Sequence, residues 1–167
     1  MLVKEFSLKV FHGERGQEMQ LDDTDFQILR LLNENSRMQW KDLGKEIHMT
    51  GQAVGNRIKK LEDNGVIRSY SVIVDEIKLG YFYTAFVIIY MKSSNHHSFI
   101  SFINQQKEIM EAHRVSGEGC YHLKIKVESQ DRLNKLMDDI LVYGNYKLYL
   151  SINEVKNQSL LTNDIQL

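Results

Sequence analysis

The 167-residue sequence has a single cysteine, Cys120, no proline and no long apolar run. One cysteine excludes an internal disulfide and is typical of a protein in a reducing compartment. The longest apolar runs, such as residues 85–91, are far too short to cross a bilayer, and the N-terminus has no signal-peptide pattern. We therefore expect a cytoplasmic protein with no membrane partner.

An excess of charge of either sign is also missing. The sequence has 21 Lys and Arg residues against 22 Asp and Glu residues, for a formal net charge of -1. This balance excludes a general polyanion binder, so any nucleic-acid surface has to come from local clusters of cations. Basic residues do cluster between Arg57 and Arg68. With 43% hydrophobic and 26% charged residues, the chain is expected to form one or two small globular domains.

Residues 43–67 contain the most informative pattern, two short amphipathic helices around a tight turn. Leu43 and Ile47 share one face of the first helix, and Thr50 is suited to cap the second. The second helix has its own apolar stripe, formed by Val54, Ile58 and Leu61. Two such helices are expected to pack crosswise as a helix-turn-helix, although an ordinary helix pair with a solvated basic face is the simpler alternative.

Polar and cationic residues occupy the outward face of the second helix. Side-chain amides bond bidentately to adenine, so Gln52 and Asn56 are candidates for reading bases, and Arg57 for a contact to guanine or phosphate. Lysines at such positions add affinity through phosphates. The full set of DNA-binding candidates is Thr50, Gln52, Asn56, Arg57, Lys59, Lys60 and Arg68. Trp40 is expected to pack against protein and not against bases.

The order of predicted elements gives two domains. Residues 19–65 are expected to form a DNA-binding domain of winged helix-turn-helix type. Its helices are one that Asp22 or Asp23 caps and that Asn35 and Ser36 end, one over about 39–48, and one over 51–64 that Gly65 ends. Residues 66–81 are rich in strand-forming residues and form a predicted strand linker. Beyond them the pattern predicts a strand over about 83–92, a helix over 96–109, strands over 111–116 and 120–128, a helix over 131–142 and a strand over 147–155. This βαββαβ order predicts a ferredoxin-like domain over residues 82–156, an α+β fold overall, and a short tail over residues 157–167.

The predicted sheet has one face without helices. If residues 118–119 form a two-residue hairpin turn, Ala112, Tyr121 and Leu123 face the helices, while His113 and His122 face away. A bare sheet face of this kind commonly dimerises or binds a ligand.

The first eighteen residues look foreign to this fold. Residues 12–18 can be encoded by an almost pure run of purines. A bacterial ribosome-binding site reads in this way when it is translated, so we expect Met19 to be the native start. The alternative is an additional N-terminal strand or arm that aids assembly.

Taken together, the motifs over residues 19–156 resemble the Lrp/AsnC family, the leucine-responsive or feast/famine regulators. The residues that carry the resemblance include the pair Leu21 and Asp22, then Asp25, and the run from Arg57 to Ile67. The resemblance implies a homodimer whose C-terminal domains pair sheet to sheet, often assembling into octamers, and which responds to amino acids or related molecules. It implies double-stranded DNA as partner and no cofactor.

Two positions depart from the family pattern. Gly51 stands where the family usually has proline, which predicts a looser helix start. The family's hairpin motif is Gly-x-x-Asp-Tyr, and this chain has Cys120 at the position of the aspartate. A thiol is a weaker hydrogen-bond acceptor than a carboxylate for the ammonium group of a ligand. The effector-binding residues that the resemblance implies are Gly117, Glu118, Gly119, Cys120 and Tyr121. The alternative is a tight hairpin that merely needs glycine.

His113, Cys120 and His122 fall on one predicted sheet face and could approach a zinc ion. One cysteine without a Cys-x-x-Cys framework makes an ordinary polar interface the better interpretation, so no metal is expected. The sequence has no nucleophile elbow or phosphate-binding loop, and no catalysis is expected. We expect a bacterial, nucleoid-associated transcription regulator. The alternatives are an architectural DNA-wrapping protein, or an enzyme or ligand-binding module that uses the His113 face.

Overall fold

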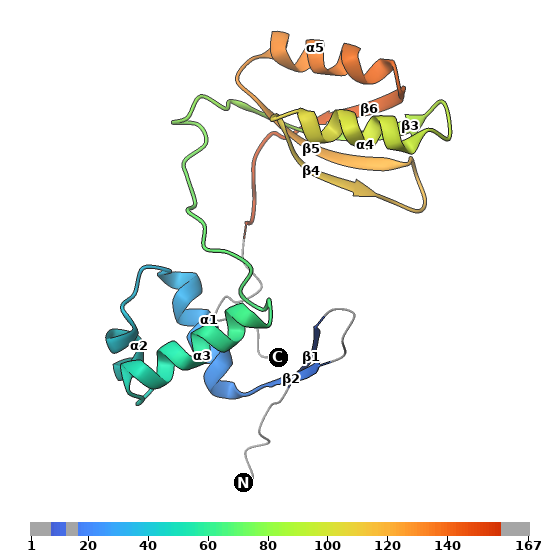
Figure 1. The fold of residues 1–167 in the computed structure, drawn as a ribbon. Coiled ribbons are helices and arrows are strands. Elements are labelled where there is room, and N and C mark those ends of the chain that lie inside the picture. Colours follow the sequence, from blue (N-terminus) through green and yellow to red (C-terminus); the bar gives the residue numbers. More distant parts are fainter. Residues whose placement is uncertain (1–7, 13–16, 158–167) are drawn as a thin grey trace. The chain divides into compact units, whose positions relative to one another are not determined.

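The computed structural model describes residues 8–12 and 17–157 (Figure 1). The chain divides into two compact units, the second of which spans Ile73–Lys156. Within the predicted N-terminal extension, β1 (Leu8–His12) pairs antiparallel with β2 (Gln17–Leu21), with Leu8 opposite Leu21. A strand therefore exists in this segment, and the start at Met19 stays a prediction. The remaining residues of the extension, 1–7 and 13–16, and the end of the tail lie outside the described residues.

Three helices form the N-terminal unit. They are α1 (Asp23–Glu34), α2 (Trp40–Glu46) and α3 (Gly51–Asp63). The first begins with a capping box, because the Asp22 carboxylate accepts from Asp25 N–H and the Asp25 carboxylate accepts from Asp22 N–H. Apolar residues at helical spacing bury one side of each helix in a single core, which contains Leu21, Phe26, Ile28, Leu29, Leu32, Leu43, Val54, Ile58 and Leu61.

The predicted strand linker and the wing are wrong for the described chain. Residues 66–82 contain no strand, so no wing follows α3, and only a helical turn forms at residues 75–80. Val72 and Ile73 are 78% and 102% exposed. Strand-forming residues need a partner strand to satisfy their backbone groups, and the described part of this chain offers them none.

The C-terminal unit has the predicted βαββαβ order. Its elements are β3 (Tyr83–Met91), α4 (His96–Gln105), β4 (Ile109–Arg114), β5 (Tyr121–Val127), α5 (Gln130–Leu141) and β6 (Gly144–Leu150). The four strands form one antiparallel sheet in the order β4-β5-β3-β6. Both helices lie on the same side of it (Figure 1). This is the ferredoxin-like arrangement, and the α+β fold class is confirmed.

Alternation along the strands separates a buried face from an open one. Val87 of β3 pairs with Leu123 of β5, and both lie in the core under the helices. The next residues along, Phe86 and Lys124, point to the open face. The hairpin between β4 and β5 is longer than predicted, since His113 pairs with His122 and Val115 N–H donates to Cys120 O, which leaves four residues in the loop. The shift is even, so the side chains within the paired strands keep their predicted faces, but Cys120, which precedes β5, packs against the core on the helix side.

Several predicted element ends are wrong, and the two largest errors are at the ends of α4 and β6. Helix α4 ends at Gln105 and not at residue 109, because Glu108 turns inward to Arg132 and Ile109 joins the sheet opposite Ile125. Strand β6 runs over 144–150 and not to residue 155, because β3, its only neighbour, pairs no further than Ala85 with Leu150. No helix within the described ranges has the length and apolar character that a bilayer crossing needs.

Candidate nucleic-acid interface and effector loop

The outward face of α3 presents the amides and lysines that the sequence predicted. Gln52, Asn56, Lys59 and Lys60 are exposed, whereas Val54, Ile58 and Leu61 are 0–1% exposed on the opposite face. The packing of this apolar stripe against α1 and α2 therefore fixes which side chains face solvent. The result is a convex polar helix face, the form in which a helix enters a major groove.

The first turn of α3 is well capped. The hydroxyl of Thr50 accepts from Ala53 N–H at 3.2 Å, so its oxygen is part of the helix start. At Gly51, a Cβ would lie 3.1 Å from the backbone N of Lys41. Close approach of α2 to α3 thus gives a physical reason for glycine where the family usually has proline.

Arg57 differs from its prediction. Its Nη1 donates to both carboxylate oxygens of Asp22, at 2.9 and 2.8 Å, and to Oδ1 of Asp25 at 2.8 Å. The side chain is 31% exposed and that of Asp25 only 6%. The expectation that Arg57 projects freely outward is wrong, because carboxylates more than thirty positions earlier in the sequence hold its guanidinium.

The ion pairs between Asp22, Asp25 and Arg57 shift pKa values within this cluster. Burial alone would raise the pKa of Asp22, but the Asp25 N–H and the Arg57 guanidinium outweigh it and lower that pKa. Burial likewise opposes the charge of Arg57, whereas the two carboxylates raise the pKa of its guanidinium. Asp22 and Arg57 are therefore both charged at neutral pH.

Residues just after α3 are tied back to it by Tyr70. Its hydroxyl donates to the Glu62 carboxylate at 2.8 Å, and burial, followed by that bond, raises the pKa of Tyr70 to about 12. Arg68 lies two residues before Tyr70 and is exposed. The contact keeps the chain that bears Arg68 near the C-terminal end of α3.

Trp40 packs on α3, as predicted. A Cβ added at Gly55 would lie 2.5 Å from Cε3 of the Trp40 ring, so the indole covers the backbone of α3 at that position. The ring is nevertheless part of a residue that is 54% exposed. Glycine within α3 is therefore explained by an aromatic side chain on the neighbouring helix.

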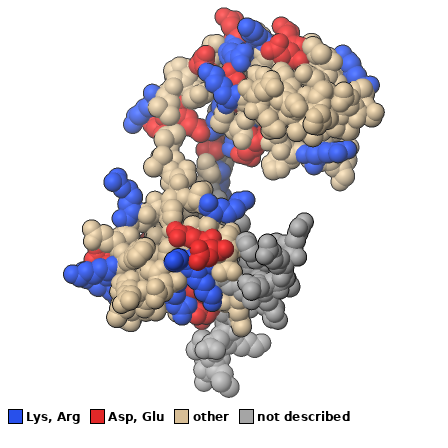
Figure 2. All heavy atoms as spheres, in the orientation of Figure 1, with Lys and Arg blue, Asp and Glu red and all other residues tan. Residues whose placement is uncertain are grey.

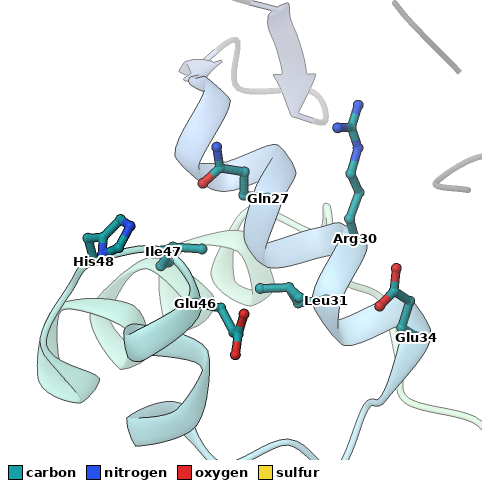
Figure 3. A pocket seen from close by; sticks show the side chains of 7 residues that line it. All are labelled: Gln27, Arg30, Leu31, Glu34, Glu46, Ile47 and His48. Carbon is teal, nitrogen blue, oxygen red and sulfur yellow. The ribbon is translucent and has the colours of Figure 1, made fainter. Parts of the chain in front are cut away.

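A groove that the sequence analysis did not predict lies between α1 and the turn after α2 (Figure 3). Its volume is about 450 Å³. Gln27, Leu31 and Glu34 line it from α1, where their i, i+4, i+7 spacing was the available signal, and His48 lines it from the turn. None of its lining residues belongs to the exposed face of α3, so the groove is separate from the DNA-binding candidates.

The loop between β4 and β5 carries Glu118 onto the open sheet face. The Tyr90 hydroxyl donates to Glu118 Oε1 at 2.6 Å, and Lys147 of β6 pairs with the same oxygen. Lys147 and then Tyr90 lower the pKa of Glu118, so the carboxylate is ionised at neutral pH. The loop backbone uses positive φ at Gly117 (122°) and Gly119 (79°), which glycine adopts without strain.

The five predicted effector residues do not share one surface. Tyr121 is 3% exposed on the helix side of the sheet, where its hydroxyl lies 3.0 Å from His96 Nδ1. Cys120 packs against that same core. Gly117, Glu118 and Gly119 remain accessible at the loop. His113 and His122 are cross-strand partners, but with Cys120 they form no group of three metal-ligating side chains within the described residues.

Charge on the two units is mixed. On the face drawn in Figure 2, basic and acidic side chains are intermixed on both units, among larger uncharged areas. Binding to DNA therefore depends on a few placed cations, in agreement with the near-neutral composition.

A helix-turn-helix with an exposed polar face on its second helix, followed by a separate ferredoxin-like domain, defines a DNA-binding regulator with its own ligand-binding domain. The comparisons agree with this class. Residues 21–62 match the model of the AsnC-type helix-turn-helix domain, and residues 84–161 match that of the Lrp/AsnC ligand binding domain. The chain belongs to the Lrp/AsnC family of transcriptional regulators, which are DNA-binding proteins and not enzymes.

Named relatives support this assignment. The chain is 58% identical over 149 residues to the HTH-type transcriptional regulator LrpB of Bacillus subtilis, covering 87% of this chain and all of that one. Among solved structures, B. subtilis LrpC matches with a TM-score of 0.80 at 28% identity, over 84% of this chain and all of LrpC. The regulator NMB0573 of Neisseria meningitidis, solved as a complex with L-Met, shares the fold with a TM-score of 0.79 at 21% identity, over 83% and 94% of the two chains.

Proposed function

We propose that this regulator recognises specific operators by placing α3 in the major groove, with Gln52 and Asn56 reading bases and Lys59, Lys60 and Arg68 binding phosphates. Thr50 caps the N-terminus of α3, which would lie at the major groove of the DNA. The observation that carries the proposal is the exposure of these side chains opposite the buried stripe of α3. Arg57 is not included as a base reader.

Two substitutions separate base reading from phosphate binding. Gln52→Ala should reduce the preference for the selected operator over a shuffled duplex about tenfold, because one bidentate contact discriminates by roughly that factor. Lys60→Ala should weaken both duplexes alike and lower the slope of log affinity against log salt by about 0.9. Fluorescence anisotropy on a duplex selected from a random library measures both. Equal losses on the two duplexes for Gln52→Ala would contradict the assignment.

The working form is proposed to be a homodimer, with octamers as a further assembly, acting in the bacterial cytoplasm at the nucleoid. The support is the exposed apolar surface of the open sheet face, where Phe86 and Tyr149 are cross-strand partners and 48% and 52% exposed. Two-fold pairing would bury this surface and give each dimer two α3 helices, the number that two half-sites need.

The effector is proposed to be an amino acid or a related small molecule that binds near the loop of residues 117–121. The accessible loop glycines and the ionised Glu118 carboxylate support a polar, charged ligand there. L-Met is the first compound to test, because NMB0573 has the same fold and was solved with it. Light scattering of the full chain with a panel of amino acids measures assembly and binding together, and an unchanged mass and melting temperature with every amino acid would contradict this proposal.

A further inference from the structure

An ion-pair cluster joins the start of α1 to the middle of α3. It consists of Asp22, Asp25 and Arg57 and is called the acidic clamp below. Three hydrogen bonds to the two carboxylates come from one nitrogen, Arg57 Nη1. The two carboxylates also form the capping box of α1. The same two residues therefore start α1 and hold the centre of α3.

The clamp sits directly beside the side chains that are proposed to read DNA. Arg57 follows Asn56 and precedes the buried Ile58, so it lies at the border between the exposed and buried faces of α3. Asp25 is 4% exposed, and a buried carboxylate that loses its partner is strongly unfavourable. This penalty favours an Arg57 side chain turned towards α1, and Asp22 accepts two of the three hydrogen bonds that fix its direction.

Apolar packing alone does not fix the rotation of a helix well. The contacts of Val54, Ile58 and Leu61 are apolar and have no preferred direction. The hydrogen bonds from one guanidinium to two carboxylates are directional. The side chains of Gln52 and Asn56 project away from the axis of α3. Even a small rotation of the helix about that axis would therefore displace them from a base edge. Bidentate base contacts tolerate little displacement.

We propose that Arg57 is a positioning residue, which through the acidic clamp holds the exposed face of α3 in the orientation that reads DNA, and that it is not itself a DNA contact. The inference rests on the proposed role of α3. It makes an unusual prediction, namely that removing negative charge from the DNA-binding domain weakens specific binding. Simple electrostatics predicts the opposite, because fewer acidic groups repel DNA less.

The decisive experiment compares Asp22→Ser with Asp23→Ser in the full chain. Serine keeps the N-cap of α1, since it is among the preferred capping residues, but it is too short to reach Arg57. Asp23 lies one residue away in the same helical turn, and the carboxylates that hold Arg57 within the described part of the chain are those of Asp22 and Asp25. Asp23→Ser therefore gives the same charge change with the clamp intact. Circular dichroism confirms that each variant is folded at the temperature used.

We expect Asp22→Ser to lower affinity for the selected operator about tenfold while affinity for a shuffled duplex stays equal or rises. Asp23→Ser should lower neither. A purely structural clamp would change the melting temperature without changing this ratio for folded protein. If Asp22→Ser and Asp23→Ser behave alike, the proposal is overturned.

A second variant tests the alternative that Arg57 touches a phosphate. Arg57→Gln should reduce the preference for the operator and leave the salt dependence of binding unchanged, whereas loss of a phosphate contact lowers the salt slope by about 0.9. A lowered slope therefore overturns the proposal. The proposed role of α3 and the proposed role of the acidic clamp can be contradicted independently. If Gln52→Ala loses operator preference and Asp22→Ser does not, only the clamp is wrong, and if Gln52→Ala loses none, the role of α3 is wrong.

Discussion

At the scale of single residues, His48 stands out in the helix-turn-helix. It occupies the turn between α2 and α3 with a φ of 56°, and it is the one non-glycine residue with positive φ among the described residues. The left-handed region costs an L-residue about 1–2 kcal/mol because Cβ approaches the backbone carbonyl. The turn is imposed by its neighbours, since Met49 N–H donates to Gly44 O at 2.7 Å. His48 therefore stores strain in this motif.

Replacing His48 with glycine should stabilise the protein. Glycine removes the steric cost but adds chain entropy to the unfolded state, so the expected net gain in unfolding free energy is about 0.5–1 kcal/mol. Urea denaturation followed by circular dichroism measures it. His48→Ala is the matched control, because alanine removes the imidazole and retains the strain. A gain of the same size in His48→Ala would show that the ring, and not the backbone, is responsible.

Arg57 shows what residue patterns miss. The spacing of Val54, Ile58 and Leu61 predicted correctly which face of α3 is buried, and it placed Arg57 at the edge of that stripe. The partner of an edge residue depends on tertiary contacts. Asp22 precedes Arg57 by 35 positions, and only the folded arrangement of α1 and α3 brings the two together.

At the scale of elements, type and order were predictable and ends were not. Helical or alternating periodicity identified all three N-terminal helices and the βαββαβ order. The ends depend on individual contacts. Pairing of Ile109 with Ile125 shortens α4, and the four-residue loop before Cys120 was missed because a tighter turn places side chains on the same faces.

Packing between α2 and α3 provides a test at this scale. Gly55 lies in the middle of α3, where alanine would favour the helix by about 1 kcal/mol. In the folded protein the Trp40 ring occupies the space of that methyl group. Gly55→Ala should therefore destabilise the wild-type protein and shift the emission of its single tryptophan, as the indole is pushed off α3.

The same substitution should behave differently without the indole. In a Trp40→Ala background, Gly55→Ala should stabilise by about 1 kcal/mol, because only the helix preference remains. The double-mutant cycle in urea measures the coupling directly. Equal effects of Gly55→Ala in the two backgrounds would mean that Trp40 does not rest on Gly55 in solution.

At the scale of the whole molecule, the order of the two domains was predictable because each has its own periodic pattern and its own core. The segment between them was not. Residues 66–74 have the composition of a strand, yet Val72 and Ile73 are exposed and unpaired with any described strand. Composition reports what a segment is able to form, and a strand forms only where a second one is present. The apolar residues of this segment and those of the open sheet face are both exposed, and both raise the question of which surface covers them.

A charge on the open sheet face tests the proposed dimer. Phe86 and Tyr149 are neighbours across β3 and β6 and expose about half of their surface, and burial of one such aromatic contributes roughly 1.5–3 kcal/mol to association. In a two-fold interface each substitution occurs twice, so Phe86→Lys buries two unpaired charges. We expect light scattering to show a halved mass, and operator affinity to fall because the two α3 helices then bind separately. Asn134→Lys, exposed on α5 at the helix side of the sheet, introduces the same charge and should change neither quantity. If Phe86→Lys keeps the wild-type mass while Asn134→Lys lowers it, the subunits associate through the helices and the open face has another role.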